Sequence, residues 1–189
     1  VLGRAKTTVE AIELLRSKKP MVPHMVMLLD AAGDAAVVER VPGEEMFVRR
    51  GRGKVPLTNH LEGPLADDPS NKRVEATTST WPRRRRLDEI LENLPAGASV
   101  QDAVRVLRDK HGLGDTTLPL GDRRTLDALI ATHGVVMDAT AKALWVSEGP
   151  HLTGRFLRFD LARLLAPDYQ GGADTAEVVA RARGTSVNQ

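Results

Sequence analysis

Apolar residues first recur at helical spacing and then give way to short extended runs. The opening pattern predicts a helix over residues 7–18, in which Thr7 and Glu10 have the spacing of a capping box. Four apolar residues share one face of this helix: Ala5, Val9, Ile12 and Leu15. Turn residues separate the runs that follow, which predicts an antiparallel meander with strands over 24–30, 35–41, 46–49 and 55–58. The first strand is apolar almost throughout, so we expect both of its faces to be covered.

The second half of the chain repeats this order of helices and then strands. Residues 62–76 are rich in Asp, Pro, Gly, Asn and Lys and predict a long polar loop. Apolar stripes at 87–94 and 100–107 then predict two helices, with Ser79 or Thr80 as the N-cap of the first and Ser99 as the N-cap of the second. Strands are expected over 128–137, 143–147 and 156–161, followed by a helical tail over 175–183 and a frayed end at 184–189. The order indicates a single α+β domain over 1–189, with helices layered on antiparallel sheets.

Composition and charge exclude several classes of protein. The 189 residues contain no cysteine, which excludes disulfide scaffolds and thiolate metal sites within this chain. The five histidines lack ligand spacing and no nucleotide-binding motif is present, so we expect neither a metal nor a cofactor. There is no apolar run long enough for a membrane span, and we expect a cytoplasmic protein without a membrane partner. The chain begins at Val1 within an amphipathic pattern, so we expect it to be part of something longer.

The first candidate site is Asn59 with His60, at the end of a predicted strand. A carboxamide there can donate two N–H bonds to a developing oxyanion without carrying charge. The alternative is that Asn59 bonds its own backbone and caps the loop, and local sequence favours this alternative. For His60, a packed or surface position is the simpler interpretation of a lone histidine beside a strand end.

The second candidate is a run of four arginines, residues 83–86, at the start of a helix. The positive end of the helix dipole disfavours cations there, and such local conflicts are tolerated at functional sites. Helical rotation places Arg83 within the apolar stripe and directs Arg85 away from it. A buried ion pair and a substrate contact are both open for Arg83, whereas a solvated helix face is expected for Arg84 and Arg85.

Five segments, taken in order, resemble one known family. They are 37–43 with 57–60, then 79–91, then 125–126, then 135–138, then 144–149. This series resembles the C-terminal half of acyl-CoA:6-aminopenicillanic acid (isopenicillin N) acyltransferase-like proteins. These are autoproteolytic N-terminal-nucleophile (Ntn) cysteine hydrolases, more distantly similar to choloylglycine hydrolases, and the resemblance covers about residues 1–165.

The resemblance implies an αββα sandwich and a nucleophilic cysteine that self-cleavage exposes as a new N-terminus. It also implies catalytic roles for Asn59, in the oxyanion hole, and for an arginine that would hold the thiolate or a substrate carboxylate. Arg83 is the first choice for this arginine and Arg86 the second. Arg86 and His60 are expected to be substrate-binding residues. This chain departs from the family because it contains no cysteine. It is therefore expected to act only as the C-terminal part of an amidohydrolase or acyltransferase, inactive on its own.

The expected partners are an N-terminal half or a separate chain that carries the cysteine, and a small-molecule amide or acyl-CoA substrate. The alternative is a non-enzymatic basic module that binds RNA or another polyanion through residues 49–54 and 83–86. Aromatic residues for base stacking are scarce, at 3%, and the net charge is only +2, so nucleic acid is not the expected partner.

Overall fold

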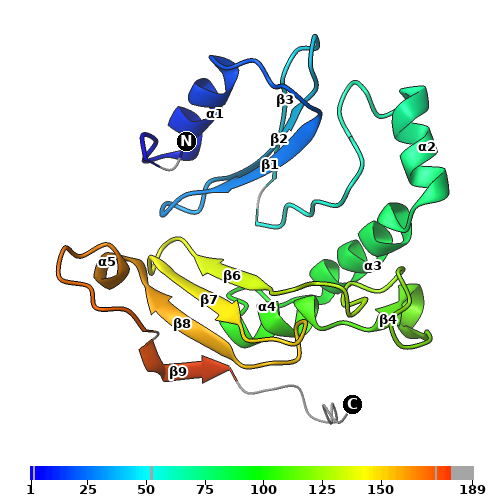
Figure 1. The fold of residues 1–189 in the computed structure, drawn as a ribbon. Helices are drawn as coiled ribbons and strands as arrows, with labels where there is room; N and C mark the ends of the chain where they lie inside the picture. Colours follow the sequence, from blue (N-terminus) through cyan, green and yellow to red (C-terminus); the bar gives the residue numbers. More distant parts are fainter. Residues whose placement is uncertain (2, 52, 173, 180–189) are drawn as a thin grey trace. The chain divides into compact units, whose positions relative to one another are not determined.

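The computed structural model describes residues 1, 3–51, 53–172 and 174–179 (Figure 1). The chain divides into two compact units, Val1–Arg84 and Arg85–Gln189, and each is described by itself below. The single domain expected over 1–189 therefore stays a prediction. The helices and antiparallel sheets confirm the α+β class.

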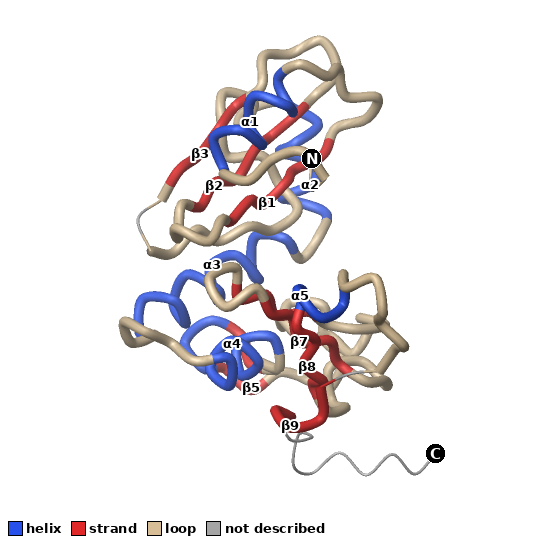
Figure 2. Tube along the Cα trace, turned by 90° about the vertical axis from the view of Figure 1, so that its left-hand side faces the viewer, coloured by secondary structure: helices blue, strands red, loops and turns tan. Residues whose placement is uncertain are grey.

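The first unit is a helix on a three-stranded antiparallel sheet. Helix α1 (Thr8–Arg16) begins as predicted, because Oγ1 of Thr7 accepts the N–H of Glu10 at 3.2 Å. The sheet has the order β1-β2-β3 and is formed by β1 (His24–Leu29), β2 (Ala35–Arg40) and β3 (Phe47–Arg50). Helix α1 packs on one face of this sheet (Figure 2). On that face Ile12 and Leu15 contact alternate residues of β1 and β2.

The opposite face of this sheet differs between its strands. On β2, Val37 is fully buried. On the edge strand β1, Met27 and Leu29 are each 51% exposed, so the expectation that both faces of this strand are covered is wrong. The reason is that no second helix lies on this face of β1 within the described part of the unit, and the strand keeps the ordinary alternation of a sheet with one packed face.

The expected strand 55–58 and the expected loop 62–76 both differ from the structure. Residues 55–58 form no strand, and helix α2 (Pro69–Thr77) occupies most of the second segment. The side chain of Asp68 caps α2 by accepting the N–H of Ser70 at 2.8 Å, and Pro69 suits the first turn. Helix α3 (Thr80–Asn93) follows and contains the boundary between the two units.

The second unit places helix α4 (Val100–Leu107) on an antiparallel sheet of the order β6-β7-β8-β9. The predicted cap is confirmed, since Ser99 and Asp102 form a capping box. The strands are β6 (Val135–Asp138), β7 (Ala143–Ser147), β8 (Phe156–Asp160) and β9 (Asp174–Val179). Short elements complete the unit: β4 (His111–Gly112), the 3-10 turn η1 (Leu113–Asp115), β5 (Thr116–Thr117) and α5 (Leu161–Leu164).

Three expectations for this unit are corrected. Residues 128–134 form no strand, so the strand is limited to β6. Residues 174–179 form strand β9 rather than a helix, because they pair with β8. The remainder of the expected helical tail and the frayed end at 184–189 lie outside the described residues.

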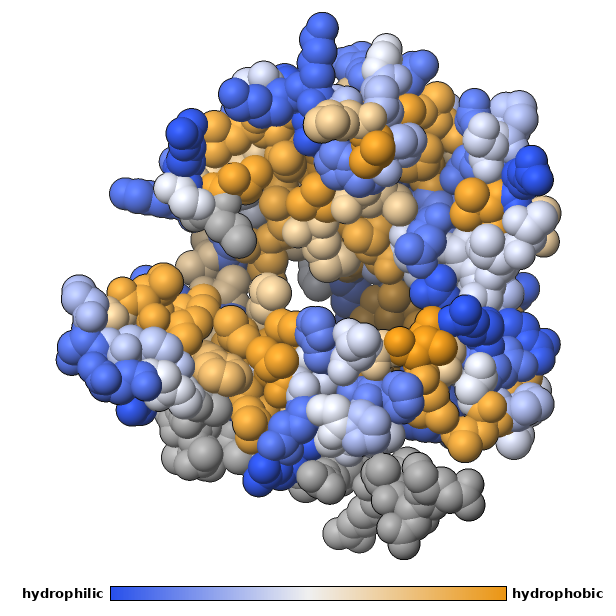
Figure 3. Space-filling model, in the orientation of Figure 1, coloured by the Kyte–Doolittle hydropathy of each residue, from blue (hydrophilic) through white to orange (hydrophobic). Residues whose placement is uncertain are grey.

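Strand register shows how the second sheet is layered. Val104 of α4 packs with Trp145 and Phe156 in the core of this unit. Along each strand, the residues that alternate with those facing α4 point to the other face of the sheet. On β6, β7 and β8 these residues are all apolar: Val135, Met137, Leu144, Val146, Leu157 and Phe159. Met137 is 69% exposed, and Figure 3 shows apolar residues at the surface of each unit. A sheet with a helix on one face and an apolar second face is consistent with half of an αββα sandwich.

Candidate functional site

The candidate site lies on an irregular stretch of the first unit whose backbone is held by side chains from distant elements. The N–H of Asn59 donates to Oγ1 of Thr80, at the start of α3, over 2.8 Å. The N–H of Leu61 donates to Oδ1 of Asn71 over 2.8 Å, and Nδ2 of Asn71 returns a bond of 3.0 Å to the carbonyl of Leu61. Side chains thus take the place of a strand ladder as the backbone partners of Asn59 and Leu61.

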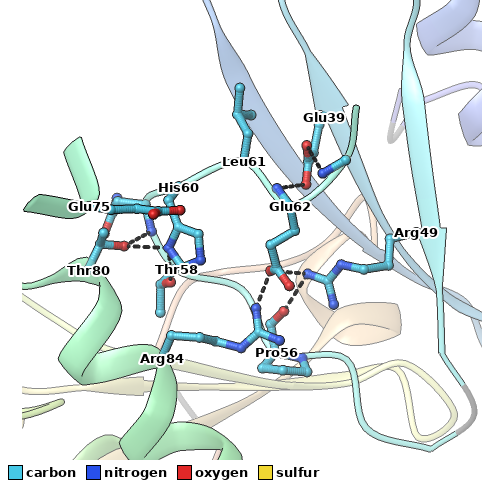
Figure 4. A network of polar contacts seen from close by, with 12 residues as sticks. Glu39, Arg49, Pro56, Thr58, His60, Leu61, Glu62, Glu75, Thr80 and Arg84 are labelled. Carbon is cyan, nitrogen blue, oxygen red and sulfur yellow. Dashed lines mark hydrogen bonds and ion pairs between the residues drawn. The ribbon is translucent and has the colours of Figure 1, made fainter. Parts of the chain in front are cut away.

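A buried glutamate on the central strand holds the next two residues. Glu39 of β2 is 5% exposed, and its two carboxylate oxygens accept the N–H groups of Glu62 and Gly63 at 2.8 and 3.0 Å (Figure 4). Gly63 also lies against the ring of Phe47, since a Cβ added to it would be 2.3 Å from Cδ1 of that ring. The two bonds to Glu39 and the close contact with Phe47 therefore fix the backbone of residues 62 and 63 against the sheet. Glu39 is a site residue that the sequence analysis missed, although an acidic residue within an apolar strand was a signal for it.

Two arginines converge on Glu62. Nη2 of Arg49 donates to Oε1 of Glu62 at 2.9 Å and to the carbonyl of Pro56 at 2.7 Å. Nη1 of Arg84 donates to the same oxygen, Oε1 of Glu62 (Figure 4). Arg84 is therefore not the solvated residue that the sequence analysis expected; its side chain is 13% exposed. The two guanidinium groups share this carboxylate, and the buried carboxylate of Glu39 lies beside the same segment, so cations and carboxylates are balanced next to Asn59.

The structure brings Asn59 and Arg83 together. Nη2 of Arg83 donates to Oδ1 of Asn59 over 2.7 Å, although the two residues are 24 positions apart in sequence. A guanidinium can only donate, so this contact fixes which end of the carboxamide faces the arginine. The Nδ2 group of Asn59 is consequently turned away from Arg83, on a residue that is exposed. An oriented amide donor beside a cation is the arrangement that stabilises a developing oxyanion.

His60 is buried beneath this segment. It is 3% exposed, and its Nδ1 atom lies 3.1 Å from the hydroxyl oxygens of both Thr58 and Thr80. The edge of its ring meets Trp81, with the ring centroids 5.3 Å apart. Nε2 has no hydrogen-bond partner among the described residues, and an unpaired buried polar atom costs about 1–3 kcal/mol. Burial lowers the pKa of His60, with nearby Glu62 opposing that shift, so the imidazole is neutral near pH 7.

The structure places Arg86 in the second unit, within a cluster of carboxylates. Its side chain is 9% exposed and donates to both oxygens of Asp109, at 2.8 and 3.0 Å. It also pairs with Glu89 and Asp115, each at 3.0 Å. The hydrogen bonds that Arg86 donates to Asp109 raise the pKa of Arg86 above its ordinary value. The substrate-binding role expected for Arg86 stays a prediction, and so do the roles of Asn59, Arg83 and His60.

Most of the described arginines in segments 49–54 and 83–86 are paired with a carboxylate. Arg50 pairs with Asp34 at 2.7 Å, as Arg49 and Arg84 pair with Glu62. Arg85 is exposed, as its helical direction predicted. The described residues hold no cluster of metal-ligating side chains, and none of the helices in the described ranges could cross a membrane.

The fold and the site define an α+β protein that presents an arginine-oriented carboxamide beside a buried neutral histidine. Comparison with known proteins adds the family. The model of the acyl-coenzyme A:6-aminopenicillanic acid acyl-transferase family matches residues 1–120, more than half of the 189-residue chain. The chain belongs to this family, and its function is of the acyltransferase or Ntn-hydrolase type. Searches of curated proteins and of solved structures gave no match.

Proposed function

We propose that this chain is the part of a cysteine Ntn hydrolase or acyltransferase that carries the oxyanion-stabilising groups. The observation that carries the proposal is the 2.7 Å contact between Nη2 of Arg83 and Oδ1 of Asn59, within a chain of this family. The attacking thiolate comes from a cysteine on polypeptide outside these 189 residues, since the chain has none. That cysteine lies on an N-terminal half or a separate chain and is exposed by self-cleavage.

The substrate is a small molecule with an acyl group in amide linkage. The thiolate attacks the carbonyl carbon, a C–S bond forms, and the carbonyl oxygen becomes an oxyanion that accepts an N–H from Asn59. Collapse breaks the C–N bond, and the leaving amine takes a proton from the α-ammonium group of the cysteine. The thioester that remains is released by water as an acid, or by a second amine as a new amide.

Arg83 acts on this reaction through Asn59, and we describe it as a positioning residue. Its bond to Oδ1 holds the carboxamide with Nδ2 outward, so no rotation of the amide is needed when charge develops. Its positive charge adds to the stabilisation of an oxyanion bound at Nδ2.

The test uses the full-length product that contains this chain and its upstream sequence. We expect self-cleavage between a glycine and a cysteine, and amide hydrolysis that a thiol-alkylating reagent abolishes. A product with neither activity, or an upstream sequence without a cysteine, would overturn the proposal.

Variants then test the two residues. Asn59→Ala should lower kcat by about 10²- to 10³-fold with a smaller effect on KM, as for removal of an oxyanion donor. Arg83→Ala should lower kcat as well, and the double variant should be little worse than Asn59→Ala, because Arg83 acts through that amide. Arg85→Ala is the matched control, since it removes an exposed arginine from the same helix. Equal activity of Asn59→Ala and Arg85→Ala would exclude Asn59 from the oxyanion hole.

A further inference from the structure

Helix α3 holds Asn59 at two points. Thr80 is the first residue of this helix, and its Oγ1 atom accepts the backbone N–H of Asn59 at 2.8 Å. Arg83, three positions later, donates to the side chain of the same asparagine at 2.7 Å. Residues three positions apart lie on one face of a helix. The N–H of Arg83 bonds the carbonyl of Ser79 at 3.2 Å, so both contacts come from one formed helical turn.

The two contacts differ in how firmly each can be held. Thr80 has no exposed surface, and its Oγ1 atom also lies 3.1 Å from Nδ1 of the buried His60 (Figure 4). Its β-branched side chain has few rotamers in a helix. Arg83 is half-buried, and its long side chain has many rotamers to lose. Thr80 is therefore the more rigid of these two partners of Asn59.

The backbone of Asn59 depends on such a partner because the residue belongs to no helix or strand. Asn71 bonds the backbone of Leu61, two residues further on, whereas Thr80 bonds the residue that carries the carboxamide. The position of Nδ2 depends on the backbone of Asn59 as well as on its side-chain torsions. The contact from Arg83 to Oδ1 therefore cannot fix that position alone.

We propose that Thr80 is a positioning residue of the oxyanion site, whose hydroxyl group sets the backbone position from which Nδ2 of Asn59 meets the carbonyl oxygen. The inference rests on the proposed function, in which Asn59 donates to the oxyanion. A displacement of about 1 Å at a catalytic group can cost about 100-fold in rate. Loss of the Thr80 hydroxyl should therefore lower kcat, while binding of the substrate by the rest of the site is unchanged.

The kinetic test compares Thr80→Val, which keeps the side-chain shape without the hydroxyl, with Thr80→Ser, which keeps the hydroxyl. Both are made in the full-length product that includes the upstream sequence, and kcat is counted per self-cleaved molecule. In Thr80→Val we expect kcat for amide hydrolysis to fall about 10- to 100-fold with KM within about twofold, and Thr80→Ser should restore most of the rate. In the Asn59→Ala background, Thr80→Val should change kcat by less than about twofold, because Thr80 acts through that residue. Thr77→Val is the matched control, since Thr77 is exposed and its hydroxyl bonds the carbonyl of Arg73 within α2.

Amide hydrogen exchange tests the contact without the reaction. In the 189-residue chain, the backbone amide of Asn59 should exchange about 100-fold more slowly than in an unstructured peptide, although the residue is exposed. Thr80→Val should remove most of this protection, and Thr77→Val should not. Wild-type kcat in Thr80→Val, or an equal loss of kcat from Thr80→Val with and without Asn59→Ala, would overturn the inference. If Thr80→Val does not fold, an unprotected Asn59 amide in the wild-type chain, or a Thr80→Ser variant as slow as Asn59→Ala, would overturn it. Wild-type activity of Asn59→Ala would overturn the proposed function instead, whereas protection of the Asn59 amide does not depend on the reaction.

Discussion

The substitution Glu39→Gln tests whether a buried carboxylate holds the segment that carries Asn59. Glu39 is 5% exposed and accepts two backbone N–H groups, from Glu62 and Gly63, at 2.8 and 3.0 Å. Glutamine keeps one acceptor oxygen, but its amide group then faces the second N–H. One hydrogen bond to a charged acceptor is lost, which corresponds to about 1.5–3 kcal/mol.

This loss should appear both globally and locally. Urea unfolding should give a free energy of unfolding lower by about 1.5–3 kcal/mol for Glu39→Gln. Amide hydrogen exchange at Glu62 and Gly63 should accelerate by about 10- to 100-fold, since each 1.4 kcal/mol is a factor of ten. Glu45→Gln is the control, because it removes the same charge from an exposed position beside the same sheet. If the two variants have the same stability and the same exchange rates, the carboxylate of Glu39 does not hold the segment.

Two further predictions concern the same unit. Gly63→Ala should lower the free energy of unfolding by about 1–3 kcal/mol, because the new methyl group would overlap the ring of Phe47. Phe47→Ala should remove much of that cost in the double variant, and Gly3→Ala, where nothing lies within 4 Å, should cost little in the same urea assay. For pH, burial lowers the pKa of His60 below its ordinary value of 6.5, so the unfolded chain binds more protons as the pH falls. Stability from neutral His60 should be complete above pH 6.5 and decline below it, and a His60→Gln variant with the same pH slope between 5 and 7.5 would contradict this.

Part of the candidate site could be read from sequence. Asn59 is recognisable as a carboxamide in a Thr-Asn-His stretch. The four arginines are recognisable because the helix dipole disfavours cations at the start of a helix. Sequence could not show that Arg83 bonds Asn59, because 24 residues separate them and the contact depends on how α3 begins beside the irregular segment. Nor could it show that Asn71 serves that segment, since an asparagine in a polar stretch carries no signal of a distant partner.

Local sequence patterns were sufficient to predict the elements whose causes are local. The capping residues Thr7 and Ser99 start their helices as expected, and the hairpins of both sheets follow from closely spaced turn residues. The hydrogen bonds of caps and tight turns join residues a few positions apart, so both partners of each bond can be identified in the local sequence.

Elements whose hydrogen-bond partners are distant in sequence depend on the fold of the whole unit, and local sequence did not predict them. Residues 55–58 have strand-like sequence but form no strand, and the segment that follows them bonds to Glu39, Asn71 and Thr80. Residues 174–179 became a strand because β8 offered a free edge to pair with. In each case, a backbone N–H needs a partner, and packing of the whole unit determines which partner is within reach.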